Sequence, residues 1–176
     1  DAPRPVSAYA ISKLAGELYV RYLWEKHFVM RLCGLYGVVG SMEKGTNFVE
    51  TMLKMAKEGK DINVVADQTL TPTYTRALAP FIKALVETKR YGLYHMTAEG
   101  GCSWYEFAEA VFELSGLKVN ISPTTSAVYK TPAKRPTYSV LENANLKKIP
   151  GISPMPHWRD ALKDYLEERK GYRGEG

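Results

Sequence analysis

The sequence has 176 residues, of which 45% are hydrophobic and 24% are charged. These values predict a folded chain with a sizeable core and exclude extensive disorder. No apolar run approaches the ~20 residues that cross a bilayer, and the opening Asp-Ala-Pro-Arg-Pro-Val lacks the apolar stretch of a signal peptide. We therefore expect a cytoplasmic protein without a membrane partner.

The net charge of +5 fits an anionic small molecule better than nucleic acid. Basic residues stand among acidic ones, as at 167–170, and form no stripe with aromatic residues, so we expect no nucleic-acid partner. Cys33 and Cys102 are too few for a disulfide framework, and no three His, Cys, Asp and Glu residues have metal-ligand spacing. The sequence thus predicts two free thiols and no metal site.

The first predicted element is a helix over residues 8–26, because apolar side chains repeat there every three or four positions. The members of this stripe, which we expect to face the core, are Ile11, Leu14, Leu18 and Tyr22. A buried strand follows at 28–33, and Gly34 ends it.

The rest of the chain continues the alternation of helices and strands. In chain order we predict a helix at 46–57, a strand at 62–65, a helix from Thr73 or Thr75 to Val86, a strand at 93–96, a helix at 103–116, a strand at 119–122 and a helix at 158–169. Pro80 predicts a bend or a late start in its helix, and we expect residues 170–176 to fray.

Two helix starts carry capping residues. Thr46 or Asn47 can cap the helix that follows it, and Ser103 with Glu106 has the spacing of a capping box. The alternation of helices and strands indicates an α/β fold rather than a helical bundle.

Tyr9 and Lys13 are four residues apart at the start of the first helix, so they lie on one face, one turn apart. An ammonium held there favours the phenolate and helps the phenol to give a proton to a carbonyl. The spacing alone is weak, because with this composition such a pair is expected about once by chance. Tyr22 and Lys26 repeat it, and we interpret that second pair as structural.

The chain contains the motif Tyr-Ala-Ile-Ser-Lys-Leu-Ala-Gly-Glu and an Asp-Gln-x-x-x-Pro-Thr loop. With these, seven segments form an ordered set: 9–17, 30–37, 47–53, 67–74, 92–95, 103–108 and 135–141. In sequence and order they resemble motifs of the extended short-chain dehydrogenases/reductases, and in particular of the dTDP-4-dehydrorhamnose reductase family. The resemblance implies the C-terminal part of a doubly wound, Rossmann-like parallel sheet with a small α/β substrate-binding domain. It places the catalytic helix and the last part of the dinucleotide-binding sheet in residues 1–45, and mainly the substrate-binding domain in 46–169, with some segments returning to the sheet.

The same resemblance implies NADPH-dependent (or NADH-dependent) reduction of the C4 ketone of dTDP-4-dehydro-L-rhamnose, which gives dTDP-L-rhamnose for cell-surface polysaccharide. Tyr9 would protonate the developing alkoxide, and Lys13 would bind the nicotinamide ribose. A partner hydroxyl and a glycine-rich phosphate loop are expected in an N-terminal half upstream of residue 1. A homodimer is left open.

Three further residues are candidates for contact with the sugar nucleotide. Gly34 stands where many members of the family have a tryptophan that packs on the sugar. In related sugar-nucleotide enzymes an arginine near this position pairs with the pyrophosphate, so the resemblance implies that role for Arg135; the alternative is a surface arginine that binds nearby carbonyls. Asn47 either contacts the sugar or only caps its helix. Asp67 and Gln68 either line the cleft or brace their loop, and we favour the bracing role, with Asp67 accepting backbone N–H bonds.

Two other functions remain open. One is an epimerase or 4,6-dehydratase of the same superfamily, which would share the tyrosine and the lysine but differ at 67–74 and 135–141. The other is a non-catalytic NADP-binding subunit, like the regulatory subunit of methionine adenosyltransferase. The Ser-Val-Leu at 139–141 favours the reductase.

Overall fold

Helices and strands alternate in the computed structural model, which describes residues 2–40, 45–131 and 133–173. The elements are α1 (Ala8–Leu23), β1 (Phe28–Arg31), β2 (Leu35–Tyr36), α2 (Phe48–Lys57), β3 (Ile62–Val65), β4 (Thr69–Leu70), β5 (Thr73–Tyr74), α3 (Thr75–Glu87), β6 (Gly92–His95), β7 (Cys102–Ser103), α4 (Trp104–Leu114), β8 (Ile121–Thr124), the 3₁₀ turn Leu146–Lys148 and α5 (Trp158–Arg173). Strands β1 and β6, β2 and β5, and β3 and β8 pair in parallel, whereas β4 and β7 pair antiparallel. The predicted α/β class is confirmed.

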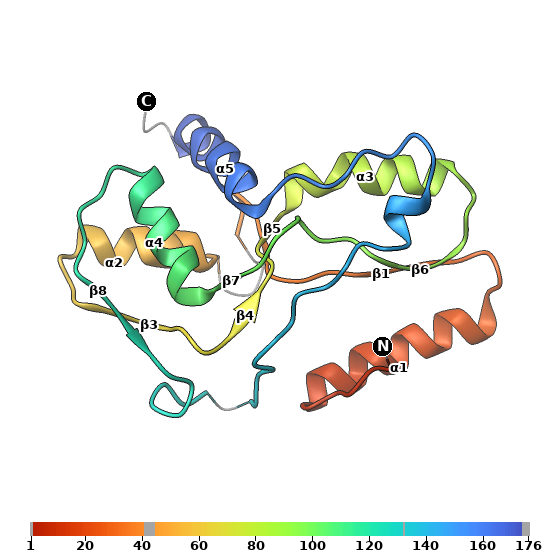
Figure 1. Ribbon diagram of the computed structural model, residues 1–176, viewed down its shortest axis with the longest axis horizontal. Helices are drawn as coiled ribbons and strands as arrows, with labels where there is room; N and C mark the ends of the chain where they lie inside the picture. Colours follow the sequence, from red (N-terminus) through yellow and green to blue (C-terminus); the bar gives the residue numbers. More distant parts are fainter. Residues whose placement is uncertain (1, 41–44, 132, 174–176) are drawn as a thin grey trace.

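The β1–β6 pair lies between two helices, with α3 on one face and α1 on the other (Figure 1). This is the three-layer arrangement that a doubly wound sheet requires. Residues of α3, β6 and the segment 146–155 form a hydrophobic core on the α3 face. Along its other edge, β1 has no strand partner among the described residues.

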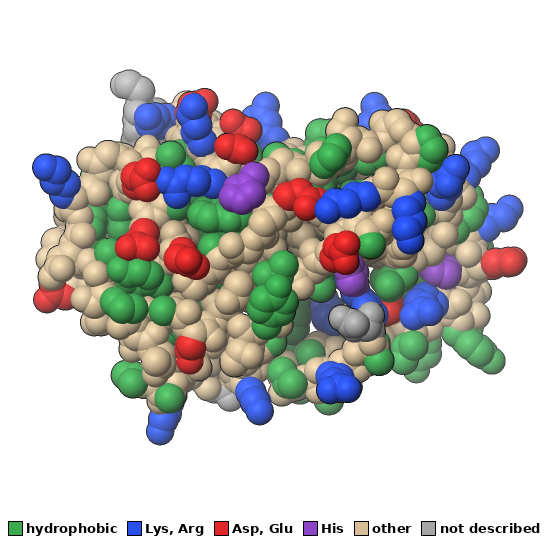
Figure 2. Space-filling view, viewed as in Figure 1, with side chains coloured by type: hydrophobic (Ala, Val, Ile, Leu, Met, Phe, Trp, Pro, Cys, Tyr) green, Lys and Arg blue, Asp and Glu red, His purple; other side chains and the backbone are tan. Residues whose placement is uncertain are grey.

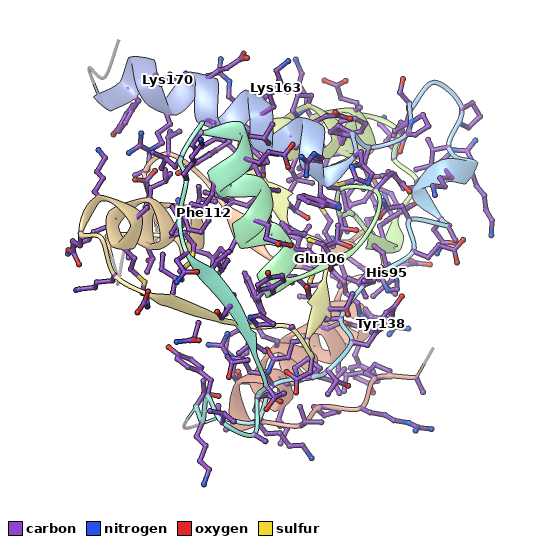
Figure 3. All side chains as sticks on the ribbon, turned by 60° about the vertical axis from the view of Figure 1, so that its left-hand side comes forward. His95, Glu106, Phe112, Tyr138, Lys163 and Lys170 are labelled. Carbon is purple, nitrogen blue, oxygen red and sulfur yellow. The ribbon has the colours of Figure 1, made fainter. Side chains whose placement is uncertain are left out.

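A second core fills the other end of the molecule. There α2, α4 and α5 lie on one side of the β3–β8 pair (Figure 1). In Figure 3, α4 with Glu106 and Phe112 lies directly below α5, which carries Lys163 and Lys170. Aromatic rings of Tyr36, Phe107 and Tyr165 meet at the centre of this core. The division at residue 45 into dinucleotide-binding and substrate-binding parts stays a prediction.

The expected helix starts occur where their capping residues are. Asn47 caps α2, and Ser103 with Glu106 forms the capping box of α4. α3 begins at Thr75 and contains Pro80, so the helix does not start late. α5 continues to Arg173, so the prediction that the chain frays from residue 170 is wrong for 170–173; residues 174–176 lie outside the described part.

The orientation predicted for α1 is wrong. Ile11, Leu18 and Tyr22, expected to face the core, are 57%, 54% and 90% exposed. None of the described residues of α1 is fully buried, and its Glu17 side chain contacts β1 instead. A repeat of three and four allows neighbouring stripes on one helix, and the sequence pattern does not say which stripe meets the sheet. Figure 2 shows hydrophobic side chains at the surface over α1, at the lower right.

Candidate functional site

Tyr9 and Lys13 lie together in the first turns of α1. Ser7 caps this helix by accepting a hydrogen bond from the Ala10 amide at 3.2 Å. The Lys13 ammonium lies 5.4 Å from the centre of the Tyr9 ring, a distance at which cation and ring attract each other. Tyr9 is 71% exposed, so its hydroxyl is accessible to a ligand.

The second tyrosine–lysine pair differs from the first. Tyr22 is in the last turn of α1, but the helix ends at Leu23 and Lys26 lies beyond it. The two residues therefore do not share a helical face, although their spacing in the sequence is the same as that of Tyr9 and Lys13.

A cavity of about 940 Å³ opens beside α2 and β3. One wall is apolar and is formed by Phe48, Met52, Met55, Ile62, Val64, Trp104 and Phe107. Phe48 and Trp104 pack with ring centres 4.6 Å apart. The polar residues around the cavity are Thr46, Asn47, Thr51, Asn63, Gln68, Thr75, Arg76, Thr131, Arg135 and Glu168. An apolar wall with a few polar groups around it is typical of a small-molecule site.

Gly34 contributes backbone to this cavity, between β1 and β2. Its φ of +57° lies in the left-handed region, and a Cβ built on it would stand 2.9 Å from the Thr71 carbonyl oxygen. The Thr73 amide donates to the Gly34 carbonyl at 3.0 Å. With the 71–73 backbone placed as it is in this chain, a side chain at this position would force that loop to move, so glycine fits this loop placement.

Asn47 caps α2 and also lines the cavity. Its Oδ1 accepts from the Glu50 amide at 3.0 Å, as the capping alternative predicted. Its Nδ2 donates to the Gly37 carbonyl at 2.8 Å and to the Tyr165 hydroxyl at 3.0 Å. Both amide protons are therefore engaged within the protein.

Two arginines line the cavity. Arg76 forms an ion pair with Glu168, and the Tyr74 hydroxyl donates to the same carboxylate. Arg135 is exposed, and within residues 2–40, 45–131 and 133–173 its guanidinium has no hydrogen bond or ion pair. Arg135 is thus the cationic group of the cavity that is available to an anion.

Residues 125–131 are attached to the loop after β3 through Ser126. Asp67 accepts from the Ser126 amide at 2.9 Å and from its hydroxyl at 2.7 Å, as the bracing role predicted. These hydrogen bonds hold the pKa of Asp67 below its ordinary value. The contact fixes the start of the segment that carries Tyr129 and Thr131 into the cavity.

The structure brings some predicted site residues together and leaves others apart. Gly34, Asn47 and Arg135 share the cavity, whereas Tyr9 and Lys13 are not among its lining residues. Phe48, Arg76, Trp104 and Tyr129 line it as well, and sequence reasoning did not assign them to a site. The sequence signal for two of them was an aromatic residue at the first position of a helix, Phe48 in α2 and Trp104 in α4. Packing in the core explains such a residue equally well.

Neither thiol belongs to a metal cluster: among the described residues, no three His, Cys, Asp or Glu are grouped to hold a metal ion. Burial, with a smaller effect of Glu106, raises the pKa of the Cys102 thiol to about 12. No helix in the described ranges has both the length and the apolar character of a membrane span.

Known proteins resemble this chain over nearly its whole length. The spore coat polysaccharide biosynthesis protein SpsK of Bacillus subtilis is 41% identical over 169 residues, which cover 96% of this chain and 57% of SpsK. The dTDP-4-dehydrorhamnose reductase of Aggregatibacter actinomycetemcomitans is 38% identical, and the match covers 93% of this chain and 58% of that protein. The crystal structure of a dTDP-4-dehydrorhamnose reductase from Bacillus anthracis in complex with NADP superposes with a TM-score of 0.88 at 39% identity. The superposition covers 96% of this chain and 58% of that structure's chain.

The chain thus spans less than two thirds of the length of these relatives. The family model described as the RmlD substrate binding domain matches residues 1–170. Fold, motif order and this match agree, and the chain belongs to the RmlD substrate-binding domain family.

Proposed function

We propose that this chain is the substrate-binding and proton-donating part of a reductase that converts dTDP-4-dehydro-L-rhamnose to dTDP-L-rhamnose with NADPH. The observation that carries the proposal is the Lys13 ammonium beside an exposed Tyr9 on the helix that covers β1. The named activity of the reductase relatives supports the choice of substrate. The reaction would take place in the cytoplasm and supply a precursor of polysaccharide.

The cavity has the chemistry that a nucleotide sugar requires. Its apolar wall, with Phe48 and Trp104, can bury a base or the methyl side of a deoxysugar. Arg135 offers a bidentate, permanently charged donor set to a pyrophosphate. Asn47 would act chiefly by holding the Gly37 carbonyl, because its own donors are engaged. Gly34 would contact the sugar only through its backbone, which lines the cavity.

The residues on α1 fit the nicotinamide half of NADPH. Among the described residues, none forms a hydrogen bond with the Tyr9 hydroxyl, and none forms a hydrogen bond or an ion pair with the Lys13 ammonium. Both groups can therefore bind ribose hydroxyls. When bound, the dihydronicotinamide supplies the hydride. Tyr9 then gives its proton to the C4 oxygen as negative charge develops there, and Lys13 stabilises the phenolate that is left.

The exposed surfaces of β1 and α1 indicate a partner for the chain. One edge of β1 has no strand partner among the described residues, and α1, which contacts β1 through Glu17, exposes apolar side chains. We infer that the N-terminal nucleotide-binding half that the relatives' greater length implies would cover both. A homodimer stays a prediction.

The test replaces Tyr9 by Phe in the protein that carries such an upstream half. The expected result is a fall in turnover of at least about 10²-fold, measured by oxidation of NADPH in the presence of the dTDP-4-keto sugar. Binding of NADPH, measured by calorimetry, is expected to stay largely intact, because Lys13 still contacts the ribose when the Tyr9 hydroxyl is removed. Tyr22→Phe is the matched control on the same helix, and its turnover is expected to equal that of the unaltered protein.

The same experiment separates the alternatives. Equal turnover in the Tyr9→Phe and Tyr22→Phe proteins contradicts the role of Tyr9. Tight NADPH binding without turnover of any dTDP-4-keto sugar favours a non-catalytic NADP-binding subunit. Release of an epimerised or dehydrated sugar without net consumption of NADPH favours the epimerase or dehydratase.

A further inference from the structure

A bidentate ion pair joins α1 to β1. The Arg31 Nε donates to Glu17 Oε2 at 2.9 Å, and Arg31 Nη2 donates to Glu17 Oε1 at 2.8 Å. The Glu17 side chain is only 9% exposed and that of Arg31 24%. Two parallel hydrogen bonds between planar groups fix orientation as well as distance.

This pair is the main polar attachment of α1 to the sheet. Within the described residues, no other side chain of α1 forms a hydrogen bond outside the helix and its capping residues. None of its described residues is fully buried within this chain, so apolar packing of α1 against this part of the sheet is weak. The rotation of α1 about its own axis therefore depends strongly on Glu17 and Arg31.

Glu17 stands one helical turn after Lys13 and two turns after Tyr9. Residues four apart differ by only about 40° around a helix, so these three side chains project from neighbouring positions on one surface. Arg31 ends β1, where it is opposite His95 of β6 in the sheet. A group fixed in the sheet thus holds the helix that carries the proposed proton donor.

We propose that Glu17 and Arg31 are positioning residues that set the place of Tyr9 and Lys13 relative to a nucleotide sugar bound in the cavity. This inference rests on the function proposed above. α1 contributes no residue to the cavity lining, so within this chain the contacts between α1 and the sheet set the placement of α1 relative to the cavity. A displacement of about 1 Å in such a geometry can lower a rate by on the order of 10²-fold.

The charge state of the pair supports a permanent attachment. Burial raises the pKa of Glu17, but the hydrogen bonds and charges of Arg31 and Arg21 outweigh it and hold the pKa below the ordinary value. Glu17 is therefore ionised at neutral pH. Arg21 contacts the same carboxylate at 3.2 Å from within the helix, and its side chain is 48% exposed.

The experiment compares Arg31→Met with Arg21→Met in the protein that carries the upstream half. Both changes remove a cation from Glu17, but only the first detaches α1 from β1. For Arg31→Met we expect kcat to fall by on the order of 10-fold to 10²-fold, with the KM for the dTDP-sugar within about 2-fold. For Arg21→Met we expect an unchanged kcat. The double exchange Glu17→Arg with Arg31→Glu is expected to recover part of the kcat that either single exchange loses.

Amide hydrogen exchange of residues 8–16 is a measurement that does not depend on enzymatic activity. We expect faster exchange in Arg31→Met than in Arg21→Met, at a temperature well below both unfolding midpoints. Equal exchange in the two variants overturns the proposed attachment, whether or not the protein is a reductase. An unchanged kcat in a folded Arg31→Met protein, or a loss that only follows the unfolded fraction, overturns the positioning role. Absence of reductase activity in the unaltered protein, with the exchange difference present, contradicts the proposed function and leaves the attachment standing.

Discussion

The amide of Asn47 and the hydroxyl of Tyr165 join the start of α2 to α5, with 3.0 Å between Nδ2 and the tyrosine oxygen. The same hydroxyl donates to Glu50 Oε1 at 2.7 Å, and Arg169 Nε donates to that oxygen at 2.7 Å. Glu50, Tyr165 and Arg169 are buried. Burial is the largest of the effects that raise the pKa of Tyr165, which keeps its hydroxyl protonated as a donor. The cavity wall beside Asn47 is therefore anchored by polar groups inside the core.

Replacement of Tyr165 by Phe removes this junction without changing the ring. We expect a loss of about 1–3 kcal/mol in the free energy of unfolding, because the Asn47 amide and the Glu50 carboxylate each lose a buried partner. Urea denaturation measures the loss. Tyr172→Phe is the control, since Tyr172 is 63% exposed on the same helix, and it is expected to change the stability by less than about 0.5 kcal/mol. Equal values for the two variants contradict the role of the hydroxyl.

Replacement of Gly34 by Ala tests the close approach of two backbone segments. The left-handed φ costs about 1 kcal/mol for a residue with a Cβ, and contact with the Thr71 oxygen adds about 1–3 kcal/mol. Gly59 is the control, because its φ is +65° and a Cβ there meets nothing within 4 Å. We expect Gly34→Ala to be the more destabilising change in thermal unfolding. The steric argument fails if Gly59→Ala is equally destabilising.

Replacement of Arg135 by Gln tests the proposed contact with the pyrophosphate. In the protein with its upstream half, we expect the KM for the dTDP-sugar to rise about 10-fold or more, equivalent to about 1.4 kcal/mol, with little change in kcat. Lys134→Gln removes the same charge from the neighbouring exposed residue, which does not line the cavity, and a much smaller effect is expected. Steady-state kinetics at two salt concentrations separates a direct contact from general attraction, which salt screens.

Acid is expected to weaken the start of α4 through Glu106. Hydrogen bonds from the backbone and hydroxyl of Ser103 hold the pKa of Glu106 below its ordinary value of 4.5. A lowered pKa means that this carboxylate stabilises the fold fully above pH 4.5 and that the contribution is lost as pH falls through the lowered value. Glu106→Gln should therefore show a flatter dependence of the unfolding midpoint on pH below about 5. Glu167→Gln, an exposed change on α5, is the comparison, and an identical slope in both variants argues against the cap.

Local signals along the chain were sufficient for the fold class and for most helix starts. Asn47 and the Ser103–Glu106 pair satisfy backbone donors within three residues, so their effect can be predicted without tertiary structure. The loop contact of Asp67 was predictable for a similar reason, although its partner Ser126 is 59 positions away and could not be named.

The orientation of α1 and the make-up of the cavity could not be predicted in this way. Ile11 and Leu18 repeat with helical spacing, but which neighbour covers them depends on contacts that the pattern does not contain. Arg76 and Tyr129 reach the cavity from segments far apart in the sequence. The link from Glu17 to Arg31 likewise depends on how α1 crosses β1, and only the tertiary structure gives that crossing.

The open edge of β1 has a practical consequence for work with this chain. The edge of β1 that has no strand partner among the described residues, together with exposed apolar side chains such as Tyr19, Leu23 and Trp24, is a template on which further chains can add. Produced alone, the chain is expected to self-associate as its concentration rises, with β1 pairing between copies. Co-expression with a covering half is expected to keep it dispersed.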